Sequence, residues 1–163
     1  MLQQPNNQQT QPHKTMKIQI LALAAAILTT IPLMAEEGHN HDKKEAGPNG
    51  GRLITSVDPH PEFLVTPDRK VQITFVEDGK VVAPAEQIIT VTTGDRSAPV
   101  KMTFTKTDTG LVSEQTVPEG NNFPVVVQIK AAPDAKGVVE KFTLNLSMCP
   151  GCNLAEYACT CAH

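Results

Sequence analysis

The chain has 163 residues, a formal net charge of −3 and an aromatic content of 4% with no tryptophan. This length fits one domain with appendages, and the sequence offers neither the basic surface nor the stacking platforms that nucleic-acid binding requires. All four cysteines lie after position 148. Any thiol chemistry is therefore confined to the C-terminal end.

The N-terminal region predicts a targeting segment preceded by a disordered lead. Residues 1–15 are rich in Gln, Asn and Pro and have no hydrophobic periodicity. Residues 16–35 follow the order of a signal peptide, with Lys17, then an apolar run, then Ala35 before the cleavage point. We therefore expect a periplasmic or secreted protein without a stable membrane anchor. An uncleaved anchor is the alternative, which the short run and its end at Pro32 disfavour.

Residues 36–51 predict a flexible linker, because they are charged and glycine-rich and have nothing to bury. The linker carries His39 and His41, one residue apart and flanked by carboxylates. Such a pair is a weak, exchangeable site for Cu(II), Zn or Ni. The alternative is a solvated linker with two incidental histidines.

The pattern between residues 52 and 147 is that of β-strands. Apolar and polar side chains alternate in three runs, which gives each one wet face: 70–75, 100–105 and 141–146. The run 123–130 predicts a more deeply buried strand, although its Val126 has the outward phase. Turn signals separate the runs at Asp78-Gly79, Gly94-Asp95, 108–110, 118–122 and 133–137.

About seven strands result, and no segment after position 35 shows sustained helical spacing. We therefore predict an all-β fold, a single antiparallel immunoglobulin-like β-sandwich over residues 52–147. The disordered N-terminal region precedes it, and a Cys-rich tail, residues 148–163, follows it.

The tail has the spacing of a metal knuckle, and its candidate ligands are Cys149, Cys152, Cys159, Cys161 and His163. Pro150-Gly151 suits a tight turn that brings the first two sulfurs together, with Gly151 tolerating a positive φ. An extended segment would place the second pair and His163 on one face. The two pairs could then complete a tetrahedral site for zinc or copper(I), the ions that soft thiolates favour.

Disulfides are the main alternative, because an exported protein enters an oxidising space. Any such bridge would close a short loop in the tail and restrain little of the unfolded sandwich. Redox chemistry is a lesser alternative: Cys149 and Cys152 have the spacing of thiol oxidoreductases, but the strand and helix alternation of those enzymes is missing. Met148 is either a core residue of the last strand or a thioether beside a Cu(I) site.

Other catalytic arrangements have little support, so we expect no enzyme. His60 is the only histidine within the expected sandwich, and it lies between two prolines in an extended loop. No phosphate-binding loop or calcium loop is found in the sequence.

The stretch Gly47-Pro48-Asn49-Gly50-Gly51-Arg52-Leu53-Ile54 follows the histidine pair and precedes Val57-Asp58-Pro59-His60. It resembles the His-rich N-terminal extension and first strand of periplasmic adaptor (membrane fusion) proteins of heavy-metal efflux systems. The resemblance covers about twenty residues, and the chain lacks the coiled-coil hairpin and barrel of an adaptor. It implies a small metal-binding β domain with an efflux component as partner, and it does not extend to the cysteines.

These features together predict an exported, non-enzymatic protein that binds copper or zinc. It would sequester the metal or deliver it to an efflux partner by ligand exchange from the histidine pair to the thiolates. Two alternatives stay open. One is a β-sandwich interaction module whose tail holds a structural zinc or disulfides, and the other is a thiol-disulfide redox protein.

Overall fold

A computed structural model describes residues 44–161 of the chain. The predicted lead and signal peptide therefore lie outside the described residues, as do three candidate ligands, His39, His41 and His163. Residues 44–161 form strands and loops without a helix. In this part of the chain there is accordingly no helix that could cross a bilayer.

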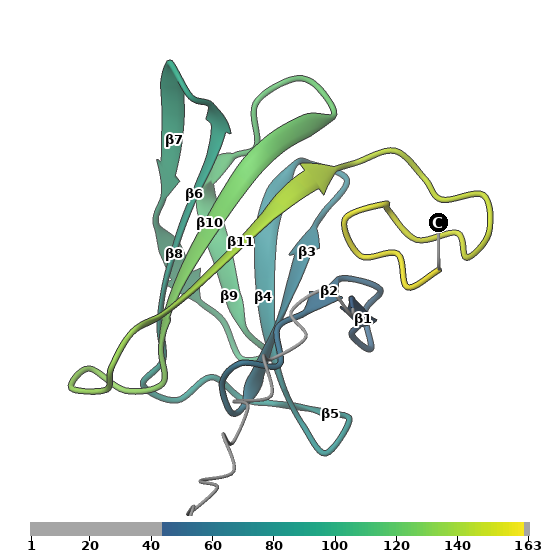
Figure 1. Cartoon of the computed structure of the whole chain (residues 1–163). Helices are drawn as coiled ribbons and strands as arrows, with labels where there is room; N and C mark the ends of the chain where they lie inside the picture. The colour runs from purple at the N-terminus through teal and green to yellow at the C-terminus, as the bar shows by residue number, and fades with distance from the viewer. Residues whose placement is uncertain (1–43, 162–163) are drawn as a thin grey trace, which may run out of the picture. The chain divides into compact units, whose positions relative to one another are not determined.

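Two antiparallel sheets make up the fold, which confirms the predicted all-β sandwich (Figure 1). The larger sheet contains, in spatial order, β1 (Glu45–Ala46), β2 (Arg52–Leu53), β3 (His60–Val65), β4 (Lys70–Glu77), β9 (Leu111–Thr116) and β8 (Phe104–Lys106), with β5 (Lys80–Val82) also beside β4. The smaller sheet contains β11 (Val138–Asn145), β10 (Asn122–Lys130), β6 (Ile88–Asp95) and β7 (Ala98–Met102).

The core lies between the sheets and is built from the alternating apolar positions. From β4 it takes Val71, Ile73 and Phe75, all fully buried, and from β10 it takes the run of alternate residues Val125, Val127 and Ile129. Val126 is only partly buried, in agreement with its outward phase. The period-2 pattern therefore assigned β4 to the correct face, whereas the deeper burial expected of β10 is wrong, because Gln128 and Lys130 in its outward phase are exposed.

The expected wet face of β4 is wrong at Thr74, which is 2% exposed. Thr74 pairs across the strands with Glu62 of β3, a carboxylate that is itself fully buried. Residues 47–51 fold against Glu62, so this part of the larger sheet is covered on both faces. The strand pattern alone could not show this, because the cover comes from another part of the chain.

The second half of the expected linker belongs to the fold. Oε1 of Glu62 accepts hydrogen bonds from the backbone N–H groups of Asn49 and Gly51, each 2.8 Å long, and Oε2 accepts one from Nδ2 of Asn49. A β-carbon on Gly47 would lie 2.3 Å from the carboxylate carbon of Glu62. The glycines here permit close packing around a buried acid, so their presence does not indicate flexibility.

Two further expectations are corrected at turns. The run 100–105 is divided at Thr103, where the chain passes from β7 in the smaller sheet to β8 in the larger one. The signal at Gly94-Asp95 lies within β6, and the reversal falls at Arg96-Ser97. There the Asp95 carboxylate accepts hydrogen bonds from both the N–H and the hydroxyl of Ser97, which stabilises the turn.

Candidate metal centre

The chain after β11 folds back on the end of the sandwich without forming a strand (Figure 1). The N–H of Glu156 donates to the carbonyl of Ser147 over 2.9 Å, and the N–H of Tyr157 donates to that of Asn145 over 3.1 Å. One isolated antiparallel bridge joins Met148 to Ala155. The extended strand expected for the second cysteine pair is therefore not found.

Tyr157 anchors this segment in the core. Its ring packs edge-on against Phe63 at 5.9 Å and is stacked with Phe142 at 6.5 Å between centroids. Its hydroxyl accepts a hydrogen bond of 2.9 Å from the N–H of Val65 in β3. The tail is thus part of the packed domain, whereas the sequence had suggested an appendage beyond it.

The docked segment brings the four cysteines together. Their Sγ atoms all lie within 4.8 Å of one another, and those of Cys152 and Cys159 are 3.4 Å apart. A zinc ion with four sulfurs at the usual bond length requires sulfur–sulfur edges of about 3.8 Å. A disulfide would instead require a separation of about 2.05 Å. No disulfide joins the four side chains in this structure, and sulfurs within 4.8 Å of one another could surround one metal ion.

The turn at the first pair differs from the one expected. Asn153, with φ of 59°, occupies the left-handed region, and its N–H donates to the carbonyl of Cys149 over 3.1 Å. Gly151 does not have a positive φ, but a β-carbon there would lie 3.2 Å from Sγ of Cys161 and 3.7 Å from Sγ of Cys149. Glycine at position 151 therefore leaves room for the sulfurs.

Backbone N–H groups point at two of the sulfurs. The pKa of Cys149 is lowered to about 6, first by a hydrogen bond with the Cys159 side chain and then by the N–H of Gly151. Burial, followed by the contact with Cys149, raises the pKa of Cys159 to about 12. Sγ of Cys159 also accepts a hydrogen bond of 3.3 Å from the N–H of Cys161. Such donors hold thiolates in place around a metal and reduce their charge.

The sulfurs differ in their access to solvent. Cys149 and Cys159 are each 1% exposed, whereas Cys152 is partly buried and Cys161 is exposed. Met148 is 63% exposed, so the first of its two predicted roles, that of a core residue, is wrong, because β11 already ends at Asn145. The cluster thus has a buried pair at its base and an accessible pair at its surface.

Within residues 44–161 the four cysteines form one group of potential metal ligands, and no histidine or carboxylate belongs to it. His60, expected in a loop, is the first residue of β3, and its Nδ1 lies 2.6 Å from the carbonyl oxygen of Val57 and 3.2 Å from the carboxylate of Asp58. Sequence reasoning identified the cysteines but missed Tyr157, whose one signal was that it is the only tyrosine of the chain.

The cluster could hold a metal ion. Comparisons of the chain with protein-family models, with curated proteins and with solved structures found no match. The function is therefore inferred from the geometry of the four sulfurs.

Proposed function

We propose that the protein binds one zinc or copper(I) ion through Cys149, Cys152, Cys159 and Cys161. The observation that carries this proposal is the separation of the four Sγ atoms, all within 4.8 Å of one another. Thiolates are the ligands that these soft ions prefer, and four of them form a closed tetrahedral site for zinc. A closed site leaves no position for a substrate, so the proposed function is binding without catalysis.

In its cellular role the protein would be exported and would sequester the metal or pass it to an efflux component. The signal-peptide pattern of residues 16–35 supports export, and the resemblance of residues 47–60 to efflux adaptors supports the choice of partner. His39 and His41 would collect ions weakly and transfer them to the thiolates. The difference in affinity between the two ligand sets gives the direction of transfer.

A second candidate is a structural zinc in a β-sandwich interaction module. One observation favours it: the cysteine segment is joined to the core through Tyr157, so a bound ion would also restrain the fold. The two candidate functions differ in how fast the bound ion exchanges with other ligands. A transfer site should lose its ion rapidly to a soluble thiol ligand through the exposed Cys161, whereas a structural ion should leave only as the segment unfolds.

The test is metal analysis combined with thiol titration on protein purified without oxygen. We expect one zinc or copper(I) ion per chain, four thiols protected from alkylation, and all four reactive after chelation. Protein that dialyses free of metal after being offered either ion would overturn the proposal. Sulfurs that are already paired in freshly prepared protein would instead establish the disulfide alternative.

A further inference from the structure

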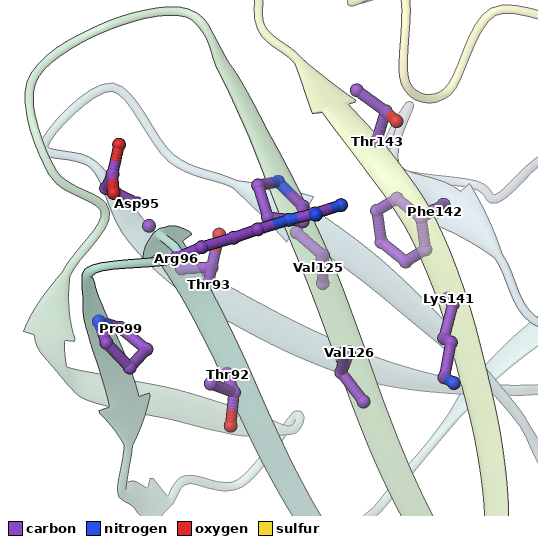
Figure 2. A pocket seen from close by; sticks show the side chains of 12 residues that line it. Thr92, Thr93, Asp95, Arg96, Pro99, Val125, Val126, Lys141, Phe142 and Thr143 are labelled. Atoms are coloured by element: carbon purple, nitrogen blue, oxygen red, sulfur yellow. The ribbon is translucent and has the colours of Figure 1, made fainter.

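A second feature, a hollow of about 510 Å³, lies on the smaller sheet (Figure 2). Residues of the β6–β7 hairpin, of β10 and of β11 line it, and no cysteine does. The volume is in the range of sites that hold small organic molecules, roughly 300–1,000 Å³. The hollow is therefore a candidate binding site separate from the sulfurs.

The hollow exists because two neighbouring strands separate. Pairing between β6 and β10 ends at Thr92 and Val126, although both strands continue beyond these residues. Beyond the last pair, β10 contains Pro124, which has no backbone N–H and therefore cannot donate a hydrogen bond to β6. β6 instead follows β7 toward the hairpin, while β10 stays paired with β11 at Thr143. The space between the β6–β7 hairpin and β10 is therefore set by the paths of the backbone.

Two cations border this space from opposite sides. Arg96 projects from the hairpin, and Figure 2 shows its side chain extending across β10 toward β11, the strand that carries Lys141, whose own side chain points away from Arg96. Neither cation has a hydrogen bond or an ion pair with any residue between 44 and 161. The one carboxylate in the lining, that of Asp95, is engaged by Ser97. The hollow thus has a local excess of positive charge in a chain whose net charge is −3.

The rest of the lining is largely apolar, although part of it belongs to an outward-facing surface. Val126 takes the outward phase of β10, where Gln128 and Lys130 of the same phase are exposed and polar. Phe142 borders the hollow from the inward phase of β11, where its ring packs against Phe63 and Tyr157. Thr93 has the inward phase of β6, and its hydroxyl is buried and has no hydrogen-bond partner in the described part of the chain. An apolar surface next to two cations suits an amphipathic anion.

We propose that this hollow binds a small organic carboxylate with an apolar body. The carboxylate is held by the guanidinium of Arg96, which can form two parallel hydrogen bonds with it, and Lys141 adds positive charge at the rim of the hollow. The apolar body lies against Val126 and its neighbours. This function is independent of the metal centre, with which the hollow shares no ligand.

The experiment is an NMR titration of the whole protein with benzoate, compared with its neutral isostere benzamide and with inorganic phosphate. We expect saturable shifts of amide signals confined to 92–96, 125–126 and 141–143. Benzamide, which lacks the negative charge of benzoate, should bind at least about tenfold more weakly, in line with the strength of hydrogen bonds between charged groups. Arg96→Gln should have a similar effect on benzoate, whereas Lys80→Gln, an exposed cation on β5, should have none.

Three results would overturn the proposal. They are the absence of saturable shifts, equal affinities for benzoate and benzamide, and unchanged benzoate binding in folded Arg96→Gln protein. Phosphate binding as tight as that of benzoate would refute the apolar part of the site. The titration is repeated after chelation, and we expect the same affinity, so a failure here is distinguishable from a failure of the metal proposal.

Discussion

The sandwich and the segment after β11, residues 146–161, are ordered by different kinds of interaction. Strands β4, β6, β10 and β11 are eight or nine residues long and are held by repeated ladder bonds over a shared apolar core. The C-terminal segment has one aromatic anchor, a few backbone hydrogen bonds and a cluster of sulfurs. Redundant contacts tolerate single losses, whereas the segment depends on particular residues. Substitution of its anchor, Tyr157, should therefore affect the whole domain, and substitutions elsewhere in the segment should have local and separable effects.

The largest effect is expected from Tyr157→Ala, which removes the connection between the two regions. Truncation of a buried aromatic side chain costs about 3–5 kcal/mol of unfolding free energy. We expect a loss of this size in urea denaturation, together with weaker zinc binding, because the sulfurs are no longer held at the sandwich. An alanine variant as stable as the wild type would show that the segment is not docked.

Tyr157→Phe is the matched control. It keeps the ring against Phe63 and Phe142 but removes the oxygen that accepts the hydrogen bond from Val65. The expected loss of unfolding free energy is about 1 kcal/mol, with zinc affinity nearly unchanged. A phenylalanine variant as damaged as the alanine variant would assign the anchoring to the hydrogen bond instead of the ring.

This anchor also marks the limit of what the sequence could predict. Strands such as β4 and β10 were predictable because alternation is local and repeats within each strand. Tyr157 is a single residue in a segment without periodicity, and it bonds to Val65, 92 positions earlier in the chain. No pattern near Tyr157 encodes a partner so distant, and the tail was therefore expected to lie outside the domain.

The next largest effect is expected on metal affinity alone. Cys159→Ser removes a buried sulfur that solvent cannot replace, so we expect the zinc affinity to fall at least about a hundredfold, since loss of mere outer-shell contacts already costs 10–100-fold. Competition with a chromophoric chelator measures it. Thr160→Ser, at an exposed position between two ligands, is the control and should bind as the wild type does.

Cys161→Ser tests the difference between the two sulfur pairs. Cys161 is exposed, so a water molecule can take its place beside the ion, and the loss of affinity should be smaller than in Cys159→Ser. The exchange of zinc with a soluble thiol ligand should change more than the affinity does. A larger loss of zinc affinity in Cys161→Ser than in Cys159→Ser would contradict the division of the cluster into a buried pair and an accessible pair of sulfurs.

The cysteine spacing was sufficient to predict that the sulfurs meet, because both pairs are local and the spacer is short. It could not predict what shapes the cluster. The positive φ lies at Asn153, and Gly151 is required for space near sulfurs that include one from the second pair. Glu62 was missed for a similar reason, since its hydrogen-bond donors come from a loop that composition alone describes as a linker.

Metal binding should stabilise the two regions unequally. At a free zinc concentration about a hundredfold above the dissociation constant, a ligand stabilises the state that binds it by roughly 2.7 kcal/mol. We expect hydrogen exchange to slow by a corresponding factor in residues 148–161, while the core amides of β4 and β10 change less. Equal protection throughout would mean that the segment and the sandwich open together, and that the ion has a structural role.

The smallest effect is expected from Gly151→Ala. The added β-carbon lies 3.2 Å from Sγ of Cys161, closer than an ordinary contact, and this exposed sulfur can shift to relieve it. We expect a loss of about 1 kcal/mol in zinc binding, roughly fivefold in affinity, with urea stability of the metal-free sandwich unchanged. Gly137→Ala is the control, because the nearest atom to its β-carbon is 3.8 Å away. If the two variants bind zinc equally well, the sulfurs do not close around the ion as tightly as their positions indicate.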